Sequence, residues 1–485
     1  MKILAVPAPL LIPVIVALTA CTPTRVDNKL PLPAVPHYSQ SGDTPTTVDP
    51  WALSSWWKGF RDPVLDALIA DALAANHDIK IAKSRVREAK SMITIAESAL
   101  YPSLEISGSG GREKSLDRVF AVPGQRGVEL IAPAGNLISG GLAARWEVDL
   151  FGGRQLEAEA VSAQAEGSRE AERSVLVGVL AQVATNYLEL RGTQARAENL
   201  RRRIDLQQQR LKVVRAFSQA GRATEWEVAR QQALLYGTEA TLPALDNAIA
   251  ALTHRLTVLT GKPPEQRDTR LAFTGRRLAT LPTIPNLLPS ALLDQRPDMR
   301  LAKTQLDAAA ASLGSARADL YPKVVLSASG GLGTLATGGM PTLAETVYAL
   351  GAGLSAPIFN AGRIRAHIAA QDAKLEQAAA NYEKTFLLAL EDVENAYVAL
   401  RSSQQRQQQS AQAEAAADAA HRHAQAFFER GVADVLAVLD AEHIRLDMYD
   451  ESIKADTAVS VGLVSLYRAL GGGWDLNDAP EARAP

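Results

Sequence analysis

Few residues in this 485-residue sequence have the types and spacing that catalysis needs. The seven histidines include one close pair, His421 and His423, but side chains two apart on a helix point in different directions and make a poor metal site. No HExxH, Walker or complete GxSxG motif occurs in the sequence. Glycines cluster at 108–111, 330–333 and 351–353, beside expected strands, so a phosphate cradle is not expected. The sequence therefore predicts no catalytic residue, no metal site and no enzymatic function.

One residue, Cys21, has a predicted covalent chemistry, and it is the only cysteine. Lys2 is followed by a short apolar segment that three prolines interrupt, and then by Leu18-Thr19-Ala20-Cys21. Residues 1–20 are therefore predicted to be a secretory signal. The tetrapeptide resembles the lipobox at which bacterial lipoproteins are acylated on their new N-terminal cysteine. We expect a covalent lipid on Cys21 and no other cofactor, and Thr22 in place of an aspartate favours the outer membrane.

The composition gives no electrostatic reason to expect a nucleic-acid partner. The 51 basic and 53 acidic residues leave a formal net charge of −2, whereas binding to phosphates needs a clustered basic surplus. Residues 22–50 contain six prolines and are expected to form an extended linker. Ala, Leu, Gln, Arg and Glu dominate the stretches after residue 150, which is typical of long helices. No apolar run reaches about eighteen residues, so no membrane-spanning helix is predicted.

The main organising feature is an internal duplication. Residues 76–102 align without gaps with residues 296–322, and both copies then continue to Ser-Gly-Gly in the same register. Farther along, Gly221 corresponds to Gly431. The expected boundaries are 1–20 for the signal, 21–55 for the lipidated cysteine and linker, 56–261 for the first repeat, 262–286 for the inter-repeat segment, 287–471 for the second repeat and 472–485 for the tail.

Each repeat is predicted to run helix, strand, strand, long helix, turn and helix. The first helix ends at a Tyr-Pro pair, because the residue before proline avoids the α region. The strands are expected within about 103–150 and 323–358. Each long helix would be about 100 Å long at 1.5 Å per residue, which no single globular core needs. Apolar residues spaced 4-3-4-3 from Leu176 and from Phe386 predict a coiled-coil seam in both copies.

Residues 142–150 show the clearest strand pattern, with apolar side chains alternating with Arg145, Glu147 and Asp149. A half-buried strand of a soluble sheet alternates in this way, and so does a barrel wall with lipid on one side and water on the other. Four strands cannot close a membrane barrel, and an open edge in lipid leaves backbone groups unpaired. If the strands span a membrane, the barrel is shared between subunits, and three chains of four strands leave room for a pore.

Five separated segments carry a resemblance to a known family: Trp56-Trp57 with Phe60-Arg61-Asp62-Pro63, the paired Tyr-Pro sites, residues 146–152, Gly431 through Ala441, and Leu470 through Trp474. They resemble the TolC-like outer-membrane efflux lipoproteins, the OprM and NodT group, over essentially the whole mature chain. The resemblance implies a mostly α-helical homotrimer in which a twelve-stranded outer-membrane β-barrel is continuous with a periplasmic α-helical barrel. It also implies the duct of a tripartite pump that exports drugs or other small molecules, with a periplasmic adaptor and an inner-membrane RND-type transporter as partners.

Two other functions fit the same patterns. One is an outer-membrane duct for type I protein secretion, with a different inner-membrane partner. The other is a periplasmic lipoprotein scaffold that uses the coiled coils as a spacer and forms no channel. A scaffold would show neither conductance in planar bilayers nor heat-modifiable electrophoretic mobility.

Four aromatic residues are candidates for a girdle at the periplasmic membrane interface. Tyr101 and Tyr321 precede the first strand of each pair, and Phe151 and Phe359 follow the second. Both strand ends lie at the same rim, where aromatic side chains favour the interface between lipid and water. Simple packing of the turns is the alternative.

The turns after the two long helices are candidates for adaptor contacts. Each turn contains a glycine, the usual residue where a helix ends in a left-handed conformation. The resemblance implies that these turns meet the tips of the adaptor at the far end of the tunnel. The expected contacts are Gly221, Arg222, Ala223, Gly431, Val432 and Ala433.

The resemblance further implies that Leu436 and Asp440 point inward and form the channel gate. They are four residues apart and so share a helix face. Arg230 occupies the position equivalent to Asp440 in the first copy, which makes an Asp440–Arg230 pair a candidate for holding the ends closed. His443 stands where the family usually has arginine, and it either makes closure sensitive to pH or fills the apolar seam of its helix.

Overall fold

The computed structural model describes residues 25–26, 53–113, 135–266, 268–273, 275, 282, 295–337 and 343–474. These residues are mostly helical and include one four-stranded sheet. The predicted signal, Cys21, most of the linker, most of the inter-repeat segment after 275 and the tail after 474 lie outside the described residues. The chain forms two compact units. The first comprises Met1–Leu30, Arg87–Glu166 and Lys303–Ala380, and the second comprises Pro31–Val86, Gly167–Ala302 and Asn381–Pro485.

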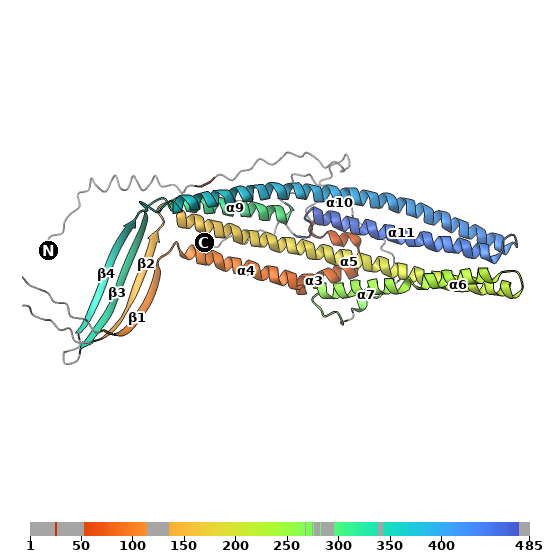
Figure 1. The fold of residues 1–485 in the computed structure, drawn as a ribbon, viewed down its shortest axis with the longest axis horizontal. Helices are drawn as coiled ribbons and strands as arrows, with labels where there is room; N and C mark the ends of the chain where they lie inside the picture. Colours follow the sequence, from red (N-terminus) through yellow and green to blue (C-terminus); the bar gives the residue numbers. More distant parts are fainter. Residues whose placement is uncertain are drawn as a thin grey trace, which may run out of the picture. The chain divides into compact units, whose positions relative to one another are not determined.

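The first unit contains the sheet, in which β1 (Ser103–Glu113), β2 (Gly135–Val148), β3 (Lys323–Thr337) and β4 (Leu343–Ser355) lie in sequence order (Figure 1). All neighbouring strands are antiparallel. The central pair joins one strand of each repeat, with Gly141 opposite Gly331. A Cβ on Gly141 would lie 2.8 Å from the carbonyl oxygen of Gly330, which explains why glycine is needed at this crossing.

Two helices precede the strand pairs and two long helices follow them. The preceding helices are α4 (His77–Ser98) and α9 (Pro297–Ala318). The long helices, α5 (Gly153–Gln219) and α10 (Arg363–Glu429), each have 67 residues and pass from the first unit into the second along the chain. No helix in the described ranges combines the length and the apolar character that a membrane crossing needs.

The return helices, which follow the turns after α5 and α10, differ between the repeats. The second repeat has one continuous helix, α11 (Val435–Ala469), as expected. The first has two, α6 (Glu225–Glu239) and α7 (Leu242–Leu259), where a single helix was expected. At the spacing that relates Gly221 to Gly431, Pro243 corresponds to Ile453. Proline has no backbone N–H and its ring clashes with the preceding turn, so the helix restarts at Leu242 with Pro243 in its first turn.

The core of the second unit is formed by residues of the long helices together with residues of η2 (Trp56–Phe60), α3 (Pro63–Ala75) and η3 (Thr269–Leu271). Tyr187 on α5 is 1% exposed, and burial raises its pKa to about 12. Its hydroxyl donates to Asp62 at 2.7 Å and accepts from Arg191 at 3.1 Å. Asp62 also caps α3, and Arg191 donates to the carbonyl oxygen of Ala272 at 2.7 Å. Hydrogen bonds thus connect α5 both to Asp62 and to Ala272, at the start of the inter-repeat segment.

Candidate channel wall and helical ends

The sheet of the first unit has one apolar face and one polar face, because side chains alternate along each strand. The register aligns Leu104, Ala144, Ala328 and Leu350 in one row. Large apolar side chains that are exposed on this face are Leu104, Ile106, Ile138, Leu142, Leu326, Leu332, Tyr348, Leu350 and Leu354. The opposite face is mostly polar and carries Glu105, Ser107, Arg145, Glu147, Ser327 and Ser329, together with Val325 and Val347. A contiguous exposed apolar sheet face of this kind marks a surface that meets lipid or another protein.

The two outer strands, β1 and β4, define the edges of this sheet. Among the described residues, β1 pairs with β2 alone and β4 pairs with β3 alone. The pairing is regular up to each edge, and each outer strand runs for more than ten residues. Long, regularly paired edge strands are templates for pairing with another strand.

The structure brings two of the four candidate girdle residues together. The rings of Phe151 and Tyr321, one from each repeat, stack with centroids 4.7 Å apart and an interplanar angle of 11°. Tyr101 and Phe359 are both exposed, at 69% and 89%. Stacked packing at the end of β2 thus accounts for one pair, and the girdle itself stays a prediction.

The six candidate adaptor contacts all lie in the two turns that join the long helices to the return helices. Gly221 and Gly431 have φ values of 69° and 70°, which glycine adopts without strain. The following N–H groups close the turns in the same way, from Arg222 to the carbonyl of Phe217 and from Val432 to that of Phe427. The next helix is capped by Thr224 in one repeat and by Asp434 in the other. The two turns therefore share one geometry, as the duplication predicts.

The predicted gate residues lie at the interface of α11 with α5. Leu436 is half-buried against a small cluster formed by Leu206, Leu439 and Leu446. Asp440 forms an ion pair with Arg210 of α5. Arg230, the expected partner, instead lies with its guanidinium 5.7 Å from the centre of the Trp226 ring. Within the described chain, Asp440 thus pairs with Arg210, and a pair with Arg230 at the closed ends of a trimer stays a prediction.

Arg210 belongs to a set of three ion pairs between α5 and α11, which we call the charged ladder. Its arginines are seven residues apart, so they lie on one stripe of the helix. The aspartates that pair with these arginines lie on the side of α11 that faces α5. The pairs are Arg196–Asp450 at 3.1 Å, Arg203–Asp447 at 2.7 Å, and Arg210–Asp440. This ladder was not predicted from the sequence, although the heptad spacing of the three arginines was a signal for it.

His443 lies beside the ladder. Its Nε2 is 3.5 Å from the carboxylate of Asp447, which also binds Arg203. The Nδ1 atom of His443 is buried and has no hydrogen-bond partner among the described residues. The side chain is 32% exposed, so it partly fills the seam and also faces a carboxylate. Both roles considered for His443 therefore remain predictions.

Comparison with known proteins decides the family. A family model described as outer membrane efflux protein matches residues 68–262 and 288–472, which together make up most of the chain. The chain belongs to the outer membrane efflux protein family. The two matched segments fall on the two copies of the duplication. Members of this family are transport channels and not enzymes.

Individual relatives match over nearly their whole length. The pyoverdine export outer membrane protein OpmQ of Pseudomonas aeruginosa is 33% identical over 467 residues, which cover 94% of this chain and 95% of OpmQ. The toluene efflux pump outer membrane protein TtgI of Pseudomonas putida is 30% identical over 424 residues, covering 86% of this chain and 87% of TtgI. The solved outer-membrane channel OprN superposes with a TM-score of 0.77 at 30% identity, covering 92% of this chain and 99% of that structure.

The fold is therefore that of the TolC-like channels, mostly helical with a sheet. The protein is an outer-membrane component of an efflux system, with a helical extension in the periplasm.

Proposed function

We propose that three copies of this chain form the outer-membrane duct of a tripartite pump, with a shared twelve-stranded barrel continuous with a helical tunnel. The observation that carries the proposal is the four-stranded sheet, amphipathic and unpaired at β1 and β4. In lipid, an unpaired edge costs several kcal/mol for each backbone group, so β4 of one copy must pair with β1 of the next. Three copies of four strands close a barrel wide enough for a pore.

The helical end of the same trimer would meet the periplasmic adaptor, and through it an inner-membrane RND-type transporter. The contacts proposed for the adaptor are the turn residues Gly221, Arg222, Ala223, Gly431, Val432 and Ala433. Val432 is 74% exposed, as a docking residue needs to be. A bulky substitution at Val432 or Ala433 should abolish efflux while the trimer still forms. Full efflux from both variants would remove these turns from the proposed interface.

The gate is proposed to lie at Leu436 and Asp440, one to three turns from the tip. Threefold symmetry would bring three copies of each side chain together and form an apolar ring next to an acidic ring. An acidic ring attracts cations and repels anions at close range. The exposure of Asp440 supports this proposal. Its side chain is 56% exposed even though it forms an ion pair with Arg210, so it could face the tunnel.

We further propose that Cys21 carries the lipid anchor and that the cargo is small molecules. Each buried methylene of an acyl chain contributes about 0.8 kcal/mol to membrane binding, so the anchor acts independently of the barrel. Cys21→Ser should abolish lipid labelling while the barrel still inserts. Pyoverdine and toluene in the names of two relatives are both small molecules, which supports a small-molecule cargo.

The decisive experiment uses the full-length protein purified in detergent. Light scattering should give the mass of a trimer, electrophoresis should show a mobility that changes on heating, and planar bilayers should show conductance. A monomer that neither conducts nor shifts on heating would refute the duct and favour a periplasmic scaffold.

A further inference from the structure

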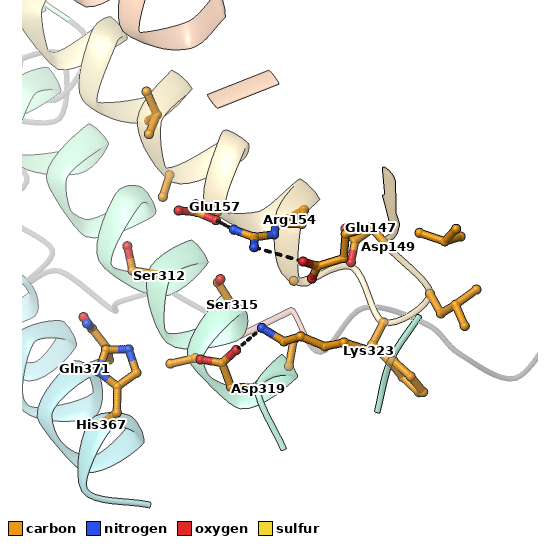
Figure 2. Close-up of a pocket in the computed structure, with 18 of the residues that line it drawn as sticks. Glu147, Asp149, Arg154, Glu157, Ser312, Ser315, Asp319, Lys323, His367 and Gln371 are labelled. Atoms are coloured by element: carbon orange, nitrogen blue, oxygen red, sulfur yellow. Dashed lines mark hydrogen bonds and ion pairs between the residues drawn. The ribbon is translucent and has the colours of Figure 1, made fainter. Parts of the chain in front are cut away.

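A cavity of about 440 Å³ lies within the first unit, where β2 ends and β3 begins. Figure 2 shows its side chains converging from the end of β2, from the first turns of α5, and from α9 and α10. None of these side chains belongs to the turns, the charged ladder or the proposed gate. Cavities that bind small molecules commonly have volumes of about 300–1,000 Å³, so this one is large enough for a drug-sized ligand.

The cavity adjoins the polar face of the sheet. Glu147 lies on that face together with Arg145, and Lys323 lies on it together with Ser327, because residues two apart share a face. Both Glu147 and Lys323 line the cavity. In the proposed barrel the polar face lines the passage, so the cavity would be a recess in the wall of the duct.

The charges in the cavity are unbalanced. Four carboxylates line it, those of Glu147, Asp149, Glu157 and Asp319, against two cationic side chains. Both cations are already engaged. Arg154 donates to Glu147 at 3.1 Å and to Glu157 at 3.0 Å, and Lys323 donates to Asp319 at 2.8 Å (Figure 2). The excess of two negative charges favours a positively charged occupant and disfavours an anion.

Each of two carboxylates keeps one oxygen that could accept from a ligand. Glu157 binds Arg154 through Oε2, and Asp319 binds Lys323 through Oδ1. In the described part of the chain, the other oxygen of each has no hydrogen-bond partner. His367 and Gln371 reach the cavity from α10 and likewise have none there. A ligand ammonium group could therefore be bound without breaking an existing ion pair.

The cavity also has apolar lining residues. Phe151, Leu150 and Val161 line it, and the Phe151 ring is held in place by stacking on Tyr321. An aromatic ring next to excess carboxylates is suited to a ligand that joins a cationic group to a flat apolar body, because the ring face also attracts cations.

We propose that this cavity is a transit site for amphipathic organic cations on their way out of the duct. Glu157 and Asp319 would accept from the ammonium group, and Phe151 would contact the apolar part. The inference rests on the proposed duct, since only there does the polar face line a passage. It names a class of cargo that the wall of the duct itself would favour.

The test compares two dyes that share one ring system and differ in charge, rhodamine 6G (cationic) and fluorescein (anionic). Binding is measured by fluorescence anisotropy on the full-length trimer in detergent. Wild type should bind rhodamine 6G saturably, more weakly as salt is added, and should not bind fluorescein. Glu157→Gln, which removes a cavity carboxylate, should weaken binding by about tenfold.

Two further variants test whether charge in the cavity itself determines the binding. His367→Lys adds a positive charge to the cavity without removing any recorded contact, and it should also weaken rhodamine 6G binding by about tenfold. Glu159→Gln is the matched control. It lies two residues from Glu157 on the same helix, also accepts from an arginine (Arg25, at 2.7 Å), and does not line the cavity. The Glu159→Gln variant should bind rhodamine 6G with the same affinity as wild type.

Several outcomes would overturn the inference: no saturable binding to wild type, equal binding of fluorescein, or equal affinities for Glu157→Gln, His367→Lys and Glu159→Gln. Conductance of the same preparation separates this failure from failure of the duct. A conducting trimer that binds neither dye would refute the transit site alone, whereas a non-conducting monomer would refute the duct as well.

Discussion

The two return helices come from one duplicated unit, yet they are held very differently. α11 is continuous and carries ion pairs on two sides. It contacts α5 through the charged ladder, and it contacts α10 through three further pairs (Figure 1). Those pairs are Glu442–His421 at 3.3 Å, Arg445–Asp418 at 3.7 Å and Glu451–Arg406 at 3.0 Å. On the other side, α6 and α7 are broken at Pro243 and make one exposed ion pair with α5, Asp246–Arg201 at 3.0 Å, in the described part of the chain.

The cause of the difference is visible at equivalent positions. Asp440, Glu442, Asp447 and Asp450 of α11 correspond to Arg230, Gln232, Gly237 and Ala240 in the first repeat. None of the four acidic side chains has an acidic counterpart. The shared apolar spacing builds similar helices in both repeats, whereas charges at a few surface positions decide which neighbour each helix holds. A duplicated pattern therefore does not imply duplicated contacts.

The largest effect is expected from placing a proline in the continuous helix α11, which tests whether Pro243 causes the difference between the return helices. Ile453 is 3% exposed in α11 and stands where the first repeat has Pro243. Ile453→Pro should cost about 3 kcal/mol or more, because it removes a helical hydrogen bond and clashes with the preceding turn. Circular dichroism during thermal unfolding measures the loss. Pro243→Ile is the mirror variant and should leave stability unchanged or raise it. Equal melting of wild type and Ile453→Pro would contradict this explanation of the break.

A second test removes one rung of the charged ladder. Asp440→Ala and Leu436→Ala channels should both conduct more than wild type in planar bilayers, and Asp440→Ala should also lose block by multivalent cations. The expected cost in stability is only about 1 kcal/mol, because Asp440 is largely exposed. Exchanging the charges, as Arg210→Asp with Asp440→Arg, should restore much of the closure.

Asp246→Ala is the control for this test, because it breaks an α5 ion pair on the side of the first return helix. Its conductance should match wild type. Unchanged conductance in both Asp440→Ala and Leu436→Ala would remove the constriction from this part of the tunnel.

A smaller effect is expected at the caps of the two return helices. Thr224 caps α6 in a reciprocal arrangement with Glu227, and Asp434 caps α11 by accepting from the N–H of Ala437 at 3.0 Å. Thr224→Ala and Asp434→Ala should each cost about 1 kcal/mol, confined to the adjoining turn. Amide hydrogen exchange at the tips measures this. We expect protection to be lost farther along α6 than along α11, because the ladder holds α11 beyond its first turns.

The smallest effect concerns pH. Burial raises the pKa of Glu442, but the hydrogen bonds from Arg445, both 2.6 Å long, and the positive charges of Arg445, His421 and Arg202 together lower it by more, so the pKa lies below its ordinary value. A lowered pKa in the folded state means that Glu442 contributes stability above its ordinary pKa of about 4.3 and loses it as pH falls through the lowered value. Wild type should therefore lose stability between about pH 5 and pH 3, and Glu442→Gln, which copies Gln232 of the first repeat, should lose less. Parallel curves for the two proteins would contradict this.

Much of the fold could be predicted from local features of the chain. The Tyr-Pro pairs end the first helices, and Gly221 and Gly431 turn the chain with φ near 70°. The alternation around Trp146 places apolar and charged side chains on opposite faces of β2. The repeat pattern nevertheless predicted one return helix in each repeat, whereas Pro243 divides that of the first repeat into α6 and α7.

The ion pair of Asp440 and the cavity beside Phe151 could not be predicted from the sequence. The sequence by itself determined which segments are helices and strands, where they turn and that the unit occurs twice, because proline, glycine and side-chain alternation act within a few residues. It did not determine that Asp440 pairs with Arg210 within this chain. Arg210 lies on α5 and Arg230 lies on α6, and the repeat alignment pointed to Arg230. Only the packing of α11 against α5 selects one, because an ion pair needs its two atoms within about 4 Å and the register between helices far apart in sequence sets that distance. The tertiary structure likewise decided the cavity beside Phe151, since its walls come from two repeats whose residues are remote along the chain.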